Sequence, residues 1–226
     1  MKPIVLFGCG KIAEVLLYFF RHHSNREVVA SCVDSAYLPG NQWQGLPTVA
    51  FEVVTQRYPA ISYDMFVALG YQDINGLREA KCRAARKLGY NLASYVHPNS
   101  GLPTGCAHGD NCFFMNQVHV QPYASFGNNV FIWSGAMVGH HSYVGDNCWI
   151  TSSAQIAGGV TVGVNTFLAI NATVGNSISI GARCYLGANS LVTKSTLDDQ
   201  VFVTESSKPF RLTTQQFFRL SRIGEY

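Results

Sequence analysis

The sequence has little charge and lacks any paired cysteine motif. Asp, Glu, Lys and Arg make up 13% of the 226 residues, and the sixteen Lys and Arg are scattered along the chain. A protein that follows nucleic acid phosphates needs clustered basic residues, so nucleic acid is excluded as a partner. The seven cysteines are an odd number without a C-x-x-C pair, which excludes a disulfide framework and a zinc knuckle.

Long apolar runs are also missing. No stretch approaches the roughly 18 apolar residues of a membrane-spanning helix. The N-terminal residues 1–7 run into a glycine-rich turn where a signal peptide would continue apolar. We therefore expect no membrane insertion and a cytoplasmic protein with reduced cysteines.

What the sequence does contain is an unbroken six-residue repeat from His108 to Leu191, fourteen hexads in all. The first position is bulky and apolar in thirteen hexads, and the fifth is small or β-branched throughout. A strict period of six predicts a short strand and a tight turn repeated many times, which is a β-solenoid. The fourth position is Asn or Gly in eight hexads, as a corner with positive φ requires. Positions one and five are then expected to face inward.

The hexads resemble those of a known enzyme family. Segments such as Val144-Gly-Asp-Asn-Cys-Trp and Ile180-Gly-Ala-Arg-Cys-Tyr are similar to the repeats of hexapeptide acyltransferases. The resemblance implies a left-handed parallel β-helix with three hexads per turn, hence roughly 4.7 coils. It also implies a homotrimer that packs through the flat sides of the coils.

The residues before the hexads indicate a small α/β domain. A buried strand at 4–7 leads into the glycine turn Gly8-Cys-Gly10-Lys11 and an apolar helix, and a second strand at 28–33 ends at Asp34. In nucleotide-binding domains such glycines let backbone amides approach phosphate, and such a carboxylate accepts hydrogen bonds from a sugar or base. The alternative is a turn that needs glycine only for close packing.

A third strand at 65–70 ends in Gly70 and Tyr71, before a helix expected from about Leu77 to Leu88. Binding loops lie at the carboxyl ends of parallel strands, so one crevice is expected to gather Gly8, Gly10, Lys11, Asp34, Gly70 and Tyr71. About 100 residues are too few for a full dinucleotide domain, which leaves little room for a nicotinamide-dependent enzyme.

These features together narrow the resemblance. The I-V-L-F-G-x-G start, the F-V-A-L-G strand, the Val96-His97-Pro98 junction and the hexads are similar to nucleotide-sugar acyltransferases grouped with sialic-acid O-acetyltransferases. Members of that family N-acetylate nucleotide-linked amino-dideoxy sugars from acetyl-CoA for lipopolysaccharide or glycan assembly. The resemblance implies a Rossmann-like nucleotide-sugar-binding domain at 1–97, an acyltransferase β-helix at 98–197 and a tail or cap at 198–226. It implies no metal.

His140 is the candidate general base. Acyl transfer requires a group that takes a proton from the acceptor, and His140 occupies the third hexad position, an outward corner. In the family the base lies in a stretch of the form apolar-Glu-His-acid before apolar-Gly-Asp, which residues 138–146 match in register. The resemblance therefore implies that His140 is catalytic; an ordinary surface histidine is the alternative.

The match also contains departures. His141 stands where the family has an acid that orients the base, so it is either a second catalytic residue or a turn residue. Two tryptophans replace polar residues that in relatives touch acetyl-CoA or the acceptor, so the resemblance implies that Trp133 contacts substrate and Trp149 contacts the cofactor, unless Trp149 packs between subunits. It also implies that the backbone of Gly158 and Ala169 follows the pantetheine arm.

The sequence thus favours transfer of an acetyl or other short acyl group from acyl-CoA to the amino group of a nucleotide-linked amino-dideoxy sugar. The alternatives are an O-acetyltransferase acting on a sugar hydroxyl and a β-helix that binds ligands without catalysis. A hydroxyl demands more of its base than an amine with a free lone pair, so the poorly supported histidine favours the amine.

Overall fold

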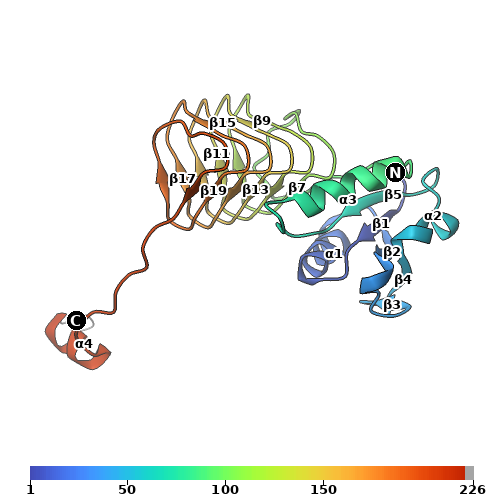
Figure 1. Ribbon diagram of the computed structural model, residues 1–226, viewed down its shortest axis with the longest axis horizontal. Helices are drawn as coiled ribbons and strands as arrows, with labels where there is room; N and C mark the ends of the chain where they lie inside the picture. Colours follow the sequence, from blue (N-terminus) through green and yellow to red (C-terminus); the bar gives the residue numbers. More distant parts are fainter. Residues whose placement is uncertain (222–226) are drawn as a thin grey trace.

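The computed structural model describes residues 1–221 (Figure 1). A sheet with helices, formed by the first part of the chain, leads into a long stack of coils, and the described residues end in an arm that carries a helix. No helix within residues 1–221 is long and apolar enough to cross a membrane.

The first sheet is mostly parallel. Strands β1 (Ile4–Phe7), β2 (Val28–Val33), β4 (Leu46–Ala50) and β5 (Asp64–Val67) run parallel in the order β4-β2-β1-β5, and β3 (Gln42–Trp43) pairs antiparallel with β4 at the edge. Their residues form nearly continuous apolar runs, as expected for parallel strands that are covered on both faces.

Helices lie on both sides of this sheet. Helix α1 (Lys11–His23) packs against the strand side chains that point to one face of the sheet. Helix α3 (Gly76–Lys87) and the short α2 (Val54–Arg57) pack against the strand side chains that point to the other face. Two 3-10 turns, η1 (Ser35–Tyr37) and η2 (Phe51–Val53), follow the carboxyl ends of β2 and β4. The sheet therefore has a layer of helix on each face.

The hexads form a parallel β-helix. Each contributes a two-residue strand, and Phe131 pairs with Phe113 and Trp149, so each coil has 18 residues and three hexads. The strands of what we call the β13 face are β6 (Tyr95–Val96), β7 (Phe113–Phe114), β10 (Phe131–Ile132), β13 (Trp149–Ile150), β16 (Phe167–Leu168), β19 (Tyr185–Leu186) and β21 (Val201–Phe202).

The other two sides of the prism have the same geometry. The β11 face contains β8 (His119–Val120), β11 (Met137–Val138), β14 (Gln155–Ile156), β17 (Thr173–Val174) and β20 (Leu191–Val192). The β12 face contains β9 (Ser125–Phe126), β12 (Tyr143–Val144), β15 (Thr161–Val162) and β18 (Ser179–Ile180).

The predicted orientation of the hexads is confirmed. All thirteen apolar first positions are buried, and His108, the one exception in type, is exposed. All fourteen fourth positions have positive φ: twelve non-glycine residues together with Gly135 and Gly159. The choice of Asn or Gly at this position therefore follows from the left-handed backbone at each corner.

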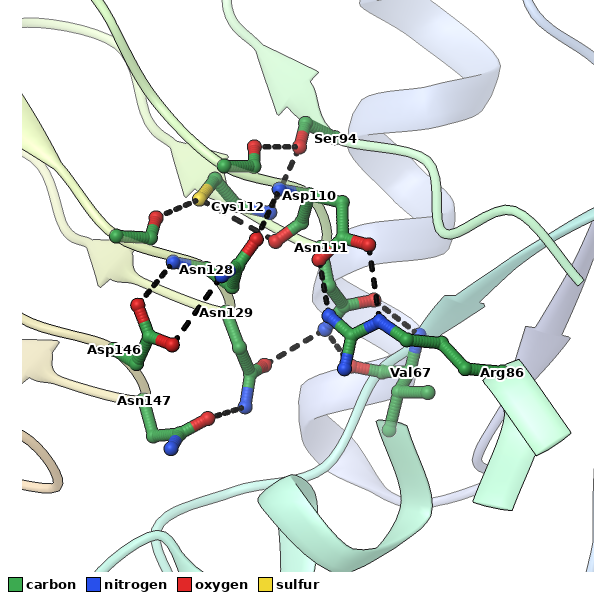
Figure 2. A network of polar contacts seen from close by, with 12 residues as sticks. Val67, Arg86, Ser94, Asp110, Asn111, Cys112, Asn128, Asn129, Asp146 and Asn147 are labelled. Atoms are coloured by element: carbon green, nitrogen blue, oxygen red, sulfur yellow. Dashed lines mark hydrogen bonds and ion pairs between the residues drawn. The ribbon is translucent and has the colours of Figure 1, made fainter. Parts of the chain in front are cut away.

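A ladder of asparagine side chains joins the coils to the first sheet (Figure 2). Each amide donates to the next along the corner between the β12 and β13 faces, from Asn111 to Asn129 (2.8 Å), Asn147 (2.9 Å) and Asn165 (3.1 Å). At its first end, Asn111 Oδ1 accepts from the Val67 backbone N–H at 2.8 Å, and its amide donates to the Val67 carbonyl. The ladder thus extends the hydrogen bonding of β5 into the coils.

Arg78 forms a second junction between the two parts. Its fully buried guanidinium donates to the carbonyls of Gly70, Asn129 and Asn147 and to side-chain oxygens of Asn75 and Asn129. It also lies 4.5 Å from the centroid of the Phe131 ring. Burial lowers the pKa of Arg78 to about 10, so the group stays charged at neutral pH.

The arm after β21 leads to helix α4 (Thr214–Ser221), which lies away from the coils (Figure 1). The sequence predicts a short helix from Thr213 to Arg222 whose Phe217, Phe218 and Leu220 would cap the last coil, but these three side chains are exposed. That expectation is wrong within one chain, because the arm runs outward. Arg222, the last residue of the expected helix, lies outside the described residues.

Candidate active site

His140 lies on the corner between the β11 and β12 faces. The corner follows directly from the hexad register, since β11 ends at Val138 and β12 begins at Tyr143. The side chain is exposed, and its backbone N–H donates to Gln121 Oε1 at 3.0 Å. The imidazole is therefore open to a ligand while the backbone beneath it is fixed.

His141 contacts His140 directly. The two Nδ1 atoms are 3.1 Å apart, and a hydrogen bond between ring nitrogens needs one ring to donate its N–H and the other to accept. The backbone N–H of His141 donates to the Pro122 carbonyl, and its ring lies 4.7 Å from the Tyr123 ring. His141 is thus a turn residue of the corner, with a φ of 57°, and it also contacts the candidate base.

Gly158 lies under the His140 ring. A Cβ at this position would lie 2.6 Å from His140 Nε2, so only glycine leaves the imidazole where it is. Among the described residues, no hydrogen bond uses the Gly158 N–H. The sequence-predicted pair His140 and Gly158 is therefore brought together, with a free backbone donor beside the ring.

Trp133 and Ala169 lie on a different edge. Both occupy the corner between the β13 and β11 faces, so the β11 face separates them from His140. The Trp133 ring packs 5.6 Å from Trp149, and its buried Nε1–H has no partner among the described residues. The Ala169 N–H donates to the Leu186 carbonyl at 2.7 Å, so this amide serves the coil instead of a ligand.

Trp149 is enclosed between the coils and the first sheet. It is 2% exposed and contacts the rings of Tyr71 and Phe131, with the Arg78 guanidinium 5.1 Å from its ring centroid. The expected contact with coenzyme A is therefore replaced by packing, because no side of the indole is open to a ligand.

A cavity of about 480 Å³ lies at the carboxyl ends of β1 and β2. Gly8, Gly10 and Asp34 line it, as the sequence predicts. Gly8 has a φ of +132°, and a Cβ there would lie 2.8 Å from the Ala68 carbonyl oxygen, so glycine is required by the close approach of β5.

Lys81 is a lining residue that sequence reasoning missed. Its Nζ lies 2.6 Å from Asp34 Oδ1 and over the rings of Phe7 and Phe51, at 5.5 and 5.7 Å from their centroids. The sequence feature that could have indicated Lys81 is its position three residues after Arg78 in the expected helix. Residues at this spacing lie on the same face of a helix.

The other residues expected in this crevice lie elsewhere. Lys11 is exposed at the start of α1, outside the cavity lining. The Gly70 carbonyl accepts from Arg78, and the Tyr71 ring lies 4.7 Å from Phe167 on the β13 face. Gly70 and Tyr71 therefore support the contact between sheet and coils.

The first sheet, which carries the cavity, contacts a different side of the prism from the corner that carries His140. The first sheet and α3 contact the β13 face and the asparagine corner through Arg78 and Asn111, whereas His140 lies at the corner between the other two faces. Within one chain, His140 therefore does not meet Gly8 or Asp34.

Three buried cysteines are poor candidates for a reactive thiol. Burial raises the pKa of Cys112, Cys148 and Cys82 to about 12, so these thiols stay protonated. Within residues 1–221, no group of three or more His, Cys, Asp or Glu side chains is arranged to hold a metal ion.

Comparison with solved structures identifies similar folds. PerB, a perosamine N-acetyltransferase from Caulobacter crescentus solved in complex with CoA and GDP-perosamine, is 26% identical, with a TM-score of 0.79 over 89% of this chain and 93% of that one. No family model and no curated protein matches the sequence.

Two further structures share the fold. The acetyltransferase domain of PglB from Neisseria gonorrhoeae, in complex with acetyl coenzyme A, is 17% identical over 92% of this chain and 99% of that one, with a TM-score of 0.80. WeeI from Acinetobacter baumannii is 16% identical over 90% and 97%, with a TM-score of 0.56. Over nearly its whole length, the chain is thus similar to the hexapeptide-repeat sugar acyltransferases, as the sequence indicated.

Proposed function

We propose that this protein transfers an acetyl or other short acyl group from acyl-CoA to the amino group of a nucleotide-linked amino-dideoxy sugar. The observation that carries this proposal is the exposed His140 over Gly158, in a fold similar to that of an enzyme solved with CoA and GDP-perosamine.

His140 acts as the general base through Nε2. A free lone pair on Nε2 requires that His140 carry its proton on Nδ1 and donate it to Nδ1 of His141, 3.1 Å away. As the amine nitrogen bonds to the acyl carbon and the carbon–sulfur bond breaks, the amine proton passes to Nε2. His141 then stabilises the imidazolium by continuing to accept from Nδ1, in the role that an acid has in relatives.

Gly158 supplies the donor for the developing oxyanion. Its unused N–H lies beside the His140 ring, and a preorganised backbone donor of this kind stabilises negative charge on the acyl oxygen. The pantetheine arm accordingly follows the corner that carries Gly158. Ala169 lies on the opposite edge of the same face, so any contact with the arm comes from another copy of the chain.

The cavity at Gly8, Gly10 and Asp34 holds the nucleotide. Residues 1–97 form a Rossmann-like domain for this purpose, residues 98–197 the left-handed acyltransferase β-helix, and residues 198–226 a tail. Asp34 accepts hydrogen bonds from the nucleoside, while the glycine turn lies near the phosphates.

The working enzyme is a homotrimer in which each site uses two copies. His140 faces away from the nucleotide cavity of its own chain, so the sugar must come from another copy. In this trimer the three-fold axis runs parallel to the long axis of the β-helix, so neighbouring copies meet at the same height along that axis. The edge that carries Trp133 and Ala169 in one copy then meets the edge that carries His140 and Gly158 in the next.

The direct test is turnover with acetyl-CoA and a panel of GDP-, UDP- and dTDP-linked amino and hydroxy sugars. Acylation of the amine is expected. Acylation of a hydroxyl alone would support the O-acetyltransferase, and no turnover together with no thermal shift by coenzyme A would contradict the proposal.

A mixing experiment tests the shared site. His140→Ala and Asp34→Ala are each expected to be inactive, but co-expressed chains form sites with one intact cavity and one intact base. Random mixing should restore about a quarter of wild-type activity. No recovery in mixed oligomers, verified by two affinity tags, would show that each site is built within one chain.

A further inference from the structure

Tyr123 has a backbone conformation that its side chain disfavours. It occupies a fourth hexad position with a φ of +68°, where most other hexads have Asn, Gly or Ser. Positive φ is rare for bulky residues, and strain of this kind concentrates at functional sites. The side chain is also 79% exposed, so burial of the ring does not compensate for the strain.

A cavity of about 470 Å³ lies beside Tyr123. Its walls are largely apolar, with Pro103 and Ala107 from the segment before the first regular coil and Pro122 and Ala124 from the corner. Two hydroxyl side chains, Thr104 and Ser125, also line it. The combination suits a ring with one apolar edge and a few hydroxyl groups.

The cavity shares a wall with the histidine pair. The Tyr123 ring lies 4.7 Å from the His141 ring at an interplanar angle of 34°, and the Pro122 carbonyl accepts from the His141 N–H. His141 in turn contacts His140 through Nδ1. A ligand in the cavity therefore lies next to the proposed base.

The direction along the coils distinguishes the two substrates. Tyr123 is one coil before His141 and therefore closer to the end that carries the first sheet and its nucleotide cavity (Figure 1). Gly158, the proposed contact of the acyl donor, is one coil after His140, on the other side of the base. The acceptor therefore approaches from the Tyr123 side.

We propose that Tyr123 and the cavity between residues 103–107 and 122–125 form the subsite for the pyranose ring of the acceptor. The aromatic face of Tyr123 packs against the C–H face of the sugar, and the deoxy carbon with its methyl group lies among the proline and alanine side chains. This inference rests on the acyl transfer proposed above and specifies which part of the chain recognises the sugar.

The test compares Tyr123→Asn with Tyr123→Phe in the full-length enzyme, using acetyl-CoA and the nucleotide-linked amino sugar that the wild type acylates. Asn accepts positive φ readily, so Tyr123→Asn should raise Tm by about 2 °C or more. It should also raise KM for the nucleotide sugar at least tenfold, with KM for acetyl-CoA unchanged. Tyr123→Phe should keep both constants within about twofold of wild type, because the ring remains.

Gln44→Asn is the matched stability control. Gln44 also has positive φ, 49°, but lies in the exposed turn between β3 and β4. The Gln44→Asn variant should have a higher Tm, with KM for the nucleotide sugar and KM for acetyl-CoA unchanged. An equal effect of both variants on kinetics would show that the Tyr123 result is global.

Each other outcome overturns the inference. A raised KM for acetyl-CoA would assign the cavity to the acyl donor, and a changed oligomeric state would assign Tyr123 to a subunit contact. Unchanged kinetics in Tyr123→Asn, with an active wild type, would refute the sugar subsite and leave the proposed function intact. An inactive wild type would refute the proposed function itself.

Discussion

Arg78 Nε donates a hydrogen bond to Asn129 Oδ1 at 2.9 Å, across 51 residues of sequence. No carboxylate bonds to this buried guanidinium in the described part of the chain; its partners are carbonyl and amide oxygens and two aromatic faces. One side chain therefore satisfies acceptors of the loop between β5 and α3 and of two successive coils.

Replacing Arg78 should weaken the junction strongly. Arg78→Met keeps most of the volume but leaves several buried oxygens without a donor, each costing about 1–3 kcal/mol when it stays unpaired. We expect the free energy of unfolding to fall by about 3 kcal/mol or more, measured by urea denaturation. Arg83→Met is the control, since Arg83 is 63% exposed and, within residues 1–221, pairs with Glu79 alone; a change within about 0.5 kcal/mol is expected. Equal effects would contradict a special role for Arg78.

His140→Ala should abolish most turnover without loss of structure. Removal of a general base costs about 10²- to 10⁴-fold, so kcat is expected to fall by at least about 100-fold while Tm and oligomeric state stay unchanged. His22→Ala, an exposed histidine on α1, should retain wild-type kinetics. Near-full turnover of His140→Ala would remove His140 from the mechanism.

Gly158→Ala should act through His140. The added Cβ would meet His140 Nε2 at 2.6 Å and displace the ring, and a displacement of about 1 Å can cost about 100-fold in rate. We expect kcat to fall by that order with little change in Tm. The double variant His140→Ala/Gly158→Ala separates the explanations: if Gly158 acts only through the ring, the double variant should be no slower than His140→Ala alone. A further loss in the double variant would show that the added methyl group disturbs the site by a second route besides the ring, since alanine keeps the backbone N–H.

His97 should make stability depend on pH. Burial, and next the neighbouring His23, lower the pKa of His97, and its Nδ1 accepts from the Asn99 N–H at 2.9 Å, which requires the unprotonated nitrogen. The unfolded chain therefore binds this proton more readily, so the free energy of unfolding should fall as pH decreases through about 6.5.

The measurement compares Tm at about pH 7.5 and about pH 6.0, a window in which carboxylates stay ionised. The decrease in Tm from about pH 7.5 to about pH 6.0 should be larger for the wild type than for His97→Asn, whatever the stability of the variant at pH 7.5. Parallel losses in the two proteins would assign the pH dependence to other groups.

The coils were predictable from sequence because a single local rule repeats. Every corner requires a positive φ, and every inward position requires a small or apolar side chain. The structural role of residues such as Asn129 and Val130 can therefore be predicted from their residue type. The same register gave the outward position of His140 before any contact was known.

The remaining site residues depend on contacts between distant segments, which no local pattern encodes. Trp149 has the outward hexad position of a ligand-facing residue, yet the first sheet covers it through Tyr71 and Arg78. Gly70 follows a strand as a binding loop does, but its carbonyl is taken by Arg78. Lys81 lines the cavity at Gly8 and Asp34 only because α3 packs beside Phe7. Each case was decided by which surfaces pack together.

The asparagine ladder also sets the unit in which this protein can change length. Because each rung is 18 residues from the next, inserting or deleting a whole number of coils preserves the register of the amide pairs, whereas any other length breaks the chain of donors. One added coil lengthens the prism by about 4.8 Å, the spacing of neighbouring strands. An insertion of this size beyond Leu186 would move the C-terminal arm outward by one coil while His140 and Gly158 keep their spacing, so the length of the prism can change independently of the histidine corner.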